Sequence, residues 1–367
     1  MPSALVVGGG IFGSALADRL VGDGWEVTLV DTFEPGDPRS ESGGETRMFR
    51  FSHGADRFYT DLAYSSLKLW RELGAGVLIE AGVVWLARRE EGWESDSEAT
   101  LRAAGVPVER LTPEETARLF PSLAVDDIAF GLLEPEGGVL RAGDGVRALV
   151  NRAREGGLEV VRGAAAPAGS GAALPDGRRL EADHVIWACG AWLGRLFPGL
   201  VELRVTRQDV CLFDVPAEWA TPGVPGWLDF DSSFYGHGLV EPHGMKVSND
   251  REGVDVDPGA RPERASEEYI RRASDYLASR FPDLAGAPLR SAPVCHYSLT
   301  ADGGFLFARH PRHRRVWLLG GGSGHGYKHG PAIAALVAGV LRGDAEPDER
   351  FRLGERAASR ALRTAGS

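Results

Sequence analysis

The segment "ALVVGGGIFGSALADRL", residues 4–20, decides the fold of this 367-residue chain. Its apolar residues 4–7 predict a short buried strand, and residues 11–23 predict a helix with apolar side chains on one face. Residues 26–31, "EVTLVD", predict a second strand. The chain therefore begins with a βαβ unit.

A glycine motif joins the first predicted strand to the helix and consists of Gly8, Gly9, Gly10, Ile11, Phe12 and Gly13. In this G-x-G-x-x-G pattern, Gly8 and Gly10 permit a tight turn close to a pyrophosphate, and Gly13 lets helix and strand pack closely. The helix N-terminus would face the phosphates, and Asp31 would accept hydrogen bonds from a ribose, which favours FAD or NAD over NADP. The motif predicts a dinucleotide site; the alternative is a glycine-rich turn that binds no ligand.

Composition limits the class of protein. With 43% hydrophobic and 25% charged residues, the chain is typical of soluble globular proteins, and its length predicts two domains. The net charge of −11 disfavours nucleic acid or an anionic membrane as a partner. Cys189, Cys211 and Cys295 are too few and scattered for a disulfide framework, so we expect a cytoplasmic protein. Glycines interrupt the N-terminal apolar run, which predicts neither a signal peptide nor a membrane span.

Further elements follow along the chain. Patterning predicts helices at residues 58–73, 144–155 and 265–281, strands at 158–162 and 185–188, and a hairpin turned at Asp176 and Gly177. Thr112 followed by Pro113 predicts a helix start. The segment 316–341 predicts a strand, a glycine loop and an apolar helix.

Two distant glycine-containing segments favour FAD over NAD. They are "HVIWACGAW", residues 184–192, and "GGGSGHGYKHG", residues 320–330. Both are suited to approach a cofactor, and simple Rossmann-type NAD enzymes rarely need a third glycine-rich element near the C-terminus. An NAD-dependent dehydrogenase remains an alternative.

Several segments in order along essentially the whole chain carry a family resemblance. The most specific are "GGETRMFRFSHGADRFY" (43–59), "ACGAWLGRL" (188–196), "FYGHG" (234–238) and "VCHYSLTADGGFLFARHP" (294–311). Through these segments and the glycine motifs near its two ends, the chain resembles the monomeric sarcosine oxidase and N-methyltryptophan oxidase group of the D-amino-acid-oxidase-like flavoproteins.

The resemblance implies an α/β (α+β) fold in which a Rossmann-type FAD-binding domain is interleaved with a substrate domain built on a mixed β-sheet. We expect the FAD-binding domain to comprise residues 1–52, 136–205 and 295–367, and the substrate domain residues 53–135 and 206–294.

Cys295 is the residue whose role the resemblance changes most. A single cysteine is, on its own, more often a buried small hydrophobe. In the family, the cysteine at this place bonds through sulfur to the 8α-methyl group of the flavin, and a thiolate is suited to that bond. The resemblance therefore implies a covalent FAD at Cys295, whereas Cys189 and Cys211 keep the interpretation of apolar side chains.

Two arginines and a lysine are implied to bind the substrate and the flavin. Arg47 and Arg50, in "ETRMFRF", would in isolation form a solvated edge. In the family, the arginine matching Arg47 lies close to the flavin, and those matching Arg50 and Lys328 bind the substrate carboxylate. An arginine fork pairs with a carboxylate in bidentate fashion and a lysine adds a point charge, which implies an amino-acid-like substrate.

Lys246, in "HGMKVSND", matches a family lysine that activates dioxygen, although a lone lysine after a glycine is usually exposed. A cation beside the flavin would stabilise negative charge as oxygen takes up an electron. Tyr235 matches a tyrosine that lines the substrate cavity, and a half-buried core tyrosine is the alternative. Lys246, Arg47 and Tyr235 are thus the implied catalytic residues.

The remaining cofactor contacts come from loops. Exposed N–H groups of the loop with Gly322, Gly324 and Gly326, and the helix that begins near Pro331, would stabilise negative charge on the flavin. We assign further FAD contacts to Gly43, Thr46, Gly190, Trp192 and Lys328.

Two departures from the family concern the substrate. Members that act on small N-methyl amino acids carry a histidine where this chain has Gly43 and Gly44, and another where it has Asn249 and Asp250. The departures suggest a larger or differently polarised amine or imino acid, and His237, His243 and His325 are candidates for compensating roles. His310 and His313 form a basic turn rather than a metal site, so we expect no metal.

Taken together, the sequence predicts an FAD-dependent amine oxidase in which the neutral substrate amine loses hydride equivalents to flavin N5. The products would be an imine and hydrogen peroxide, from an amino-acid substrate and O2. We expect a monomer. The alternatives are an FAD-dependent dehydrogenase and an electron-passing subunit of a complex.

Overall fold

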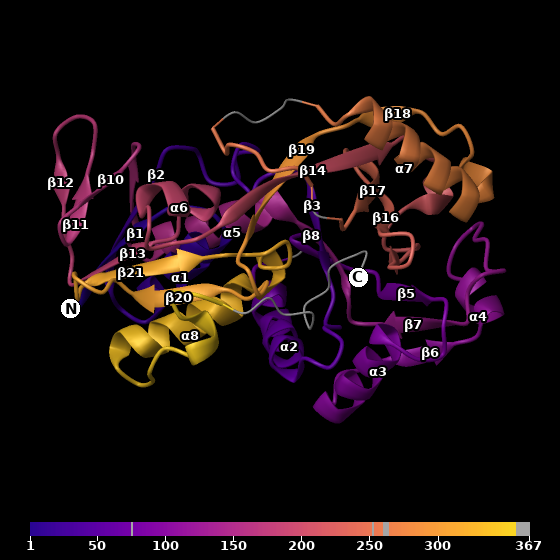
Figure 1. The fold of residues 1–367 in the computed structure, drawn as a ribbon, viewed down its shortest axis with the longest axis horizontal. Helices are drawn as coiled ribbons and strands as arrows, with labels where there is room; N and C mark the ends of the chain where they lie inside the picture. The colour runs from indigo at the N-terminus through magenta and orange to yellow at the C-terminus, as the bar shows by residue number, and fades with distance from the viewer. Residues whose placement is uncertain (75, 252, 260–263, 357–367) are drawn as a thin grey trace.

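The structure is a computed structural model that describes residues 1–74, 76–251, 253–259 and 264–356. The described residues form two large sheets, one toward each end of an elongated molecule (Figure 1). A small three-stranded sheet lies between them and contains β3 (Thr46–Phe49), β8 (Gly138–Arg141) and β4 (Leu78–Glu80). This arrangement puts β3, with Arg47 on it, near the middle of the molecule.

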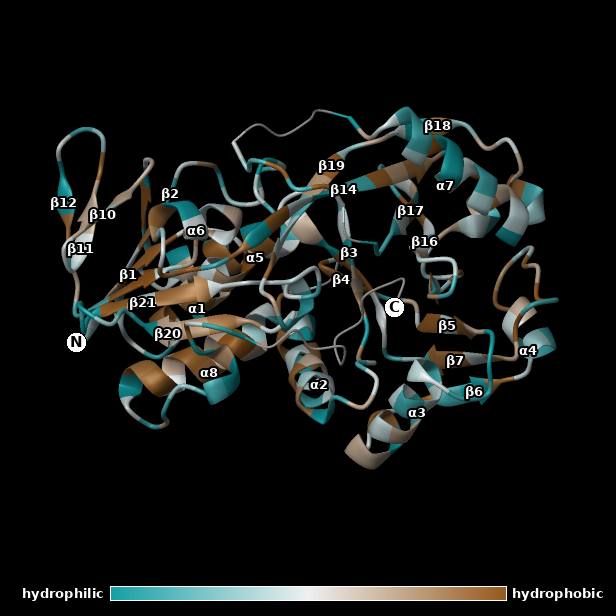
Figure 2. Ribbon diagram, in the orientation of Figure 1, coloured by the Kyte–Doolittle hydropathy of each residue, from teal (hydrophilic) through white to brown (hydrophobic). Residues whose placement is uncertain are grey.

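The first large sheet contains the predicted βαβ unit. Among the described residues it has the strand order β20-β21-β13-β1-β2-β9, in which every pair is parallel except β20 with β21. Its strands are β1 (Ser3–Val7), β2 (Glu26–Asp31), β9 (Glu159–Arg162), β13 (His184–Trp187), β20 (Leu306–Arg309) and β21 (Val316–Gly320). The apolar runs of β1 and β21 are brown in Figure 2, as expected for parallel strands buried on both faces.

Three helices cover one face of this sheet. α1 (Ile11–Gly22) packs against both α5 (Ala142–Glu155) and the apolar helix α8 (Gly330–Arg342). A small sheet of β10 (Ala166–Ala168), β11 (Gly171–Ala173) and β12 (Arg179–Leu180) projects at the end of the molecule (Figure 1). The hairpin predicted at Asp176 and Gly177 is its β11–β12 turn. The short α6 (Leu193–Leu196) follows β13.

The second large sheet is mixed. Within the described residues its order is β18-β14-β17-β16-β15-β5-β7-β6, with β19 also paired to β14, and only β15 with β5 is parallel. The strands are β5 (Val83–Ala87), β6 (Glu109–Leu111), β7 (Phe130–Glu134), β14 (Arg204–Phe213), β15 (Gly226–Asp229), β16 (Phe234–Val240), β17 (Gly244–Asn249), β18 (Leu289–Ser291) and β19 (Val294–Leu299). The ladder of β14 with β19 runs through the middle of the molecule and sets Cys295 opposite Gln208 (Figure 1).

Helices pack around this second sheet. They are α4 (Pro113–Ala117), which contacts β6 and β7, and α7 (Glu267–Arg280), which contacts β14 and β17. α2 (Arg57–Glu72) instead packs against α8 and against α3 (Trp93–Ala104). The predicted start of α4 is a capping box in which the Thr112 hydroxyl accepts from the backbone of Glu115. No helix among the described residues has both the length and the apolar character needed to cross a membrane.

The α/β fold with a Rossmann-type sheet and a mixed sheet is confirmed. The helices predicted at 58–73, 144–155 and 265–281 correspond to α2, α5 and α7. The division of the chain into two interleaved domains stays a prediction.

Candidate functional site

A cavity of about 480 Å³ lies between the two large sheets. Its walls come from the glycine motif after β1, the ends of β2 and β13, the strands β3, β14, β16, β17 and β19, and the glycine loop after β21. Most of the residues assigned to the cofactor and substrate from the sequence line this one cavity: Gly8, Gly10, Ile11, Phe12, Asp31, Arg47, Arg50, Gly190, Trp192, Tyr235, Lys246, Cys295, Gly322, Gly324, Gly326 and Lys328.

The glycine motif forms one end of the cavity. Gly8 has φ of +106°, and a Cβ there would lie 2.4 Å from the carbonyl oxygen of Ala188, the residue after β13. Asp31 accepts from the backbone N–H of Gly9 at 2.5 Å and of Phe33 at 2.9 Å, which holds its carboxylate beside the loop. Burial raises the pKa of Asp31.

Gly13 does not line the cavity. A Cβ on it would lie 1.8 Å from the carbonyl oxygen of Gly8, so only glycine lets α1 approach the loop so closely. The packing role of Gly13 in the motif agrees with this geometry, and its assignment as a direct cofactor contact has no support from the cavity wall.

Arg47 and Cys295 meet in the middle of the cavity. The Arg47 guanidinium donates to the carbonyl oxygens of Thr46 at 2.7 Å, Glu41 at 2.8 Å and Gly43 at 2.9 Å. Its Nη2 also donates to Sγ of Cys295 at 3.4 Å. The carbonyls fix the guanidinium, which places a positive charge against the Cys295 sulfur.

Lys246 is buried on β17, with 4% of its surface exposed. Its Nζ donates to the carbonyl oxygen of Thr46 at 3.3 Å and lies 5.4 Å from the ring centroid of Tyr235. Burial lowers the pKa of Lys246. The Tyr235 hydroxyl pairs with the Tyr297 hydroxyl at 3.4 Å, so lysine and tyrosine share one wall of the cavity.

Arg50 and Lys328 form the second pair of cations. The Arg50 guanidinium lies 5.1 Å from the ring centroid of Trp85 and donates to the carbonyl oxygen of Ser52. Lys328 is buried, and its Nζ donates to the carbonyl oxygen of His325 at 3.2 Å. Both line the cavity, although 278 positions separate them in the chain.

The C-terminal glycine loop closes tightly against the rest of the site. Gly324 has φ of +75°, and a Cβ there would lie 2.7 Å from the ring of Tyr297. A Cβ on Gly326 would lie 2.8 Å from Gly322 and 2.9 Å from the ring of Phe12. The loop thus packs against both Tyr297 on β19 and Phe12 in the N-terminal motif.

Gly43 and Thr46 lie outside the main cavity and line a smaller one beside Arg47, Lys246 and Cys295. The Thr46 hydroxyl pairs with Nε2 of His237 at 2.8 Å. Nδ1 of His237 contacts the carbonyl oxygen of Gly238 at 2.7 Å, so both ring nitrogens are engaged.

Sequence reasoning missed Glu41. Ser298 donates to its carboxylate at 3.2 Å, a Cβ on Gly190 would lie 2.4 Å from that carboxylate, and burial raises the pKa of Glu41 to about 7. It also missed His53 and His329, which lie with His325 beside Lys328. Burial, and secondarily the charge of Lys328, hold the pKa of each of these histidines well below its usual value. His53 and His329 lie in segments already quoted above, but nothing in those segments shows that the two rings meet.

Comparisons with known proteins fit this geometry. The chain is 28% identical to the monomeric sarcosine oxidase of Bacillus sp. (strain B-0618), over 94% of this chain and 93% of that protein. It is 23% identical to the N-methyl-L-tryptophan oxidase of Salmonella arizonae, over 91% of this chain and 93% of that protein.

A solved structure has the same fold. The L-proline dehydrogenase of P. horikoshii superimposes with a TM-score of 0.82, at 19% identity, over 96% of this chain and 97% of that chain. The sequence pattern of one family, described as DAO, FAD dependent oxidoreductase, matches residues 3–340. This chain therefore belongs to the DAO family of FAD-dependent oxidoreductases.

Proposed function

We propose that this protein, as a monomer, oxidises the C–N bond of a secondary or cyclic amino acid and reduces O2 to hydrogen peroxide. The observation that carries the proposal is that Arg50, Lys328 and Lys246 line the same cavity as the glycine motif and Cys295. Two relatives are a sarcosine oxidase and an N-methyl-L-tryptophan oxidase, which supports N-methyl amino acids as the kind of secondary amine proposed.

The residues present fit FAD. The cavity is long enough to reach from Asp31, beside the N-terminal motif, to Cys295 and the C-terminal glycine loop. Side chains are missing from its walls at Gly8, Gly10 and Gly322, so backbone N–H groups can approach a pyrophosphate or a ring. When bound there, FAD would accept two electrons from the substrate and pass them to oxygen.

Arg50 and Lys328 are proposed to hold the substrate carboxylate. A guanidinium provides two parallel N–H donors, whereas an ammonium group provides a compact charge. The face of Trp85 supports the Arg50 guanidinium, and the Trp70 indole N–H donates to the Lys328 carbonyl at 2.8 Å. Two supported cations would orient the amine toward the centre of the cavity, where Cys295 and Lys246 lie.

Lys246 is proposed to stabilise the negative charge that oxygen acquires as it is reduced. A buried cation exerts a stronger field than an exposed one, because little water screens it. Its Nζ is held by the Thr46 carbonyl, so the charge is in place before oxygen arrives.

The substrate is proposed to differ from sarcosine. Gly43 and Gly44 provide no histidine at the start of β3, and Asp250 lines the cavity where small-substrate relatives carry an imidazole. Of the compensating candidates, His325 lines the cavity, whereas His237 is engaged by Thr46 and Gly238 and His243 lies outside the wall. His325 is the candidate that can reach a substrate.

Cys295 is proposed to bind FAD covalently, supported by the contact of its sulfur with the Arg47 guanidinium. Forming the thioether removes one hydrogen from the thiol and one from the 8α-methyl group, and O2 takes up both with two electrons as hydrogen peroxide. Acid-precipitated protein should stay yellow, and Cys295→Ser should release its flavin. Cys189→Ser is the matched control, because Cys189 lines the same cavity. If acid precipitation of the unsubstituted protein leaves the yellow colour in the supernatant, the covalent bond is excluded.

The function is tested by peroxide release from purified holoenzyme over a panel of N-methyl and cyclic amino acids and the corresponding amines without a carboxylate. We expect activity with carboxylate substrates only. Arg50→Met and Lys328→Met should each raise KM by at least about tenfold, since each removes a charge-assisted hydrogen bond of about 1.5–3 kcal/mol.

The alternative is a dehydrogenase or an electron-passing subunit. Substrate would then bleach the flavin without peroxide formation, even in air. No bleaching with any amine would contradict both interpretations.

A further inference from the structure

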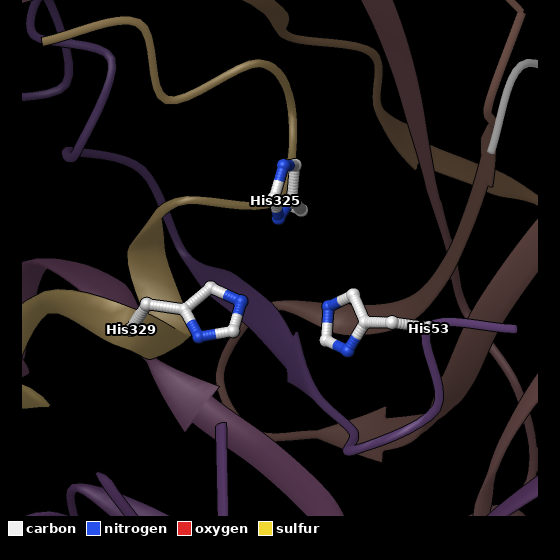
Figure 3. Close-up of side chains that lie close together, drawn as sticks. All are labelled: His53, His325 and His329. Carbon is white, nitrogen blue, oxygen red and sulfur yellow. The ribbon is translucent and has the colours of Figure 1, made fainter. Parts of the chain in front are cut away.

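Three histidine rings meet beside the end of the cavity that contains Arg50 and Lys328. His53 follows β3, His325 belongs to the C-terminal glycine loop, and His329 directly precedes α8. One ring nitrogen from each lies within 4.8 Å of those of the other two. Figure 3 shows a nitrogen of His53 facing a nitrogen of His329, with the His325 ring next to the space between them. Three distant segments thus bring three imidazoles to one point.

Backbone carbonyls orient two of the rings. Nδ1 of His53 donates to the Phe51 carbonyl at 2.8 Å, and Nε2 of His325 donates to the Gly303 carbonyl at 3.0 Å. A carbonyl oxygen only accepts, so the engaged nitrogens carry the protons and the other nitrogen of each ring keeps a lone pair. Metal-ligating histidines commonly show this arrangement, in which the second ring N–H donates to a carbonyl.

Within the part of the chain that the structure describes, the nitrogens left over have no hydrogen-bond partner. They are Nε2 of His53, Nδ1 of His325 and both ring nitrogens of His329, and all are buried. His53 and His329 have 3% and 0% of their surfaces exposed. Buried polar atoms without a partner are costly, and several converging ones indicate a ligand.

We propose that His53, His325 and His329 form a binding site for a divalent first-row transition metal ion such as Zn²⁺. Neutral imidazole suits Zn²⁺, Co²⁺ and Cu²⁺, whereas Mg²⁺ and Ca²⁺ require oxygen ligands. Zn–N bonds of about 2.0–2.1 Å in tetrahedral geometry place ligand nitrogens about 3.4 Å apart, so the rings close by no more than about 1.4 Å.

The neighbouring charges set the strength of the site. Lys328 and Arg50 carry positive charge close to the three rings, and Lys328 Nζ donates to the carbonyl of His325 itself. Repulsion from both makes binding weaker than at a structural zinc site, which lacks such neighbours. His325 also lines the cavity, so the three-histidine cluster adjoins it. If Arg50 and Lys328 bind the carboxylate, as the proposed function states, the ion adds to their attraction for it.

The test is metal binding by the FAD-loaded protein, which needs no turnover. After dialysis against dilute Zn²⁺ and removal of free ion, we expect one Zn²⁺ per chain. Co²⁺ should give the visible bands of a tetrahedral site, at wavelengths beyond the flavin absorption. His53→Gln and His329→Gln should each weaken Zn²⁺ binding at least about tenfold.

Two further variants separate this site from other sources of binding. His310→Gln is the matched control, because His310 is also a buried histidine, its ring centroid lies 4.7 Å from that of His313, and it is not one of the three cluster histidines; it should leave Zn²⁺ binding unchanged. Lys328→Met should tighten Zn²⁺ binding several-fold, because it removes a repelling charge. A purely structural histidine cluster would not respond in this way.

The proposal is overturned by the absence of stoichiometric Zn²⁺, by binding that survives both His53→Gln and His329→Gln, or by binding that His310→Gln abolishes. Melting curves and flavin content establish that each variant folds. If His53→Gln does not fold, His329→Phe decides, because phenylalanine fills the same buried space without a ligand atom. Failure of Zn²⁺ binding leaves the oxidase proposal intact, since peroxide release is measured separately.

Discussion

Cys295 and Arg47 are 248 positions apart in the chain, yet Nη2 of Arg47 donates to the Cys295 sulfur at 3.4 Å. The sequence singled out both residues through the segments around them. It could not show that they touch, because the contact depends on β3 and β19 meeting between the two large sheets. The contact places a guanidinium beside the Cys295 sulfur, which is the kind of surrounding in which nucleophilic cysteines are found.

Lys246 provides a test of oxygen chemistry at a single residue. Replacing it with methionine removes a buried charge but keeps a similar length of apolar chain. We expect Lys246→Met to slow reoxidation of the enzyme by O2 about 10²–10³-fold, the usual effect of losing one preorganised electrostatic group. Anaerobic reduction by substrate should change far less.

Stopped-flow absorbance of the flavin measures the two half-reactions separately. Lys68→Met is the control, because Lys68 is exposed on α2. Equal slowing of both half-reactions by Lys246→Met would assign Lys246 to substrate binding or structure instead.

Glu41 makes stability depend on pH. Burial raises its pKa to about 7 from a usual value of 4.5, so the folded protein binds more protons than the unfolded chain between these values. Its contribution to stability is therefore lost as pH rises from about 4.5 through 7, by at most about 3 kcal/mol. Glu41→Gln should remove this part of the pH dependence.

Urea unfolding of both proteins at pH 5 and pH 8 gives the comparison, with Glu114→Gln as control, because Glu114 is exposed on α4. The free energy of unfolding of native protein should fall more between the two pH values than that of Glu41→Gln. The same fall in both proteins would mean that Glu41 is solvated.

At the scale of elements, helix α1 contains two glycines with opposite requirements. A Cβ on Gly13 would lie 1.8 Å from the Gly8 carbonyl oxygen, whereas one on Gly22 would meet nothing within 4 Å. Gly13→Ala should destabilise the protein by roughly 1–3 kcal/mol or more and lower its FAD content, because the loop must move. Gly22→Ala should be neutral or stabilise it by up to about 1 kcal/mol.

Thermal melting and the ratio of flavin to protein absorbance measure both effects. The pair matters because both changes add one methyl group to the same helix. Equal behaviour of the two variants would contradict the tight packing of α1 on the glycine motif.

The elements themselves were largely predictable. The spacing of apolar residues and the glycines between segments predicted β1, α1 and β2, and the Thr112 cap predicted α4, because these signals are local. The order of strands in the mixed sheet was not predictable in this way. The parallel pair of β5 with β15 joins residues 83–85 to 226–228, and no pattern within either strand encodes its partner.

At the scale of the whole molecule, the site exists because the fold brings distant segments of the chain together at one cavity. Arg50, Lys246 and Lys328 come from three separate segments and line one cavity. The family resemblance anticipated this set of residues, but not Glu41 or the pairing of His53 with His329. Their roles depend on packing, which brings Glu41 to the cavity wall and His53 next to His329.

The central claim is that an amino acid held by its carboxylate gives two electrons to FAD, which oxygen then removes. Anaerobic titration of the holoenzyme with an N-methyl or cyclic amino acid, followed by readmission of O2, tests it most directly. We expect that the substrate bleaches the flavin, that the matching amine without a carboxylate does not, and that O2 restores the colour with one hydrogen peroxide per flavin. Bleaching by the amine alone, or colour restored without peroxide, would contradict it.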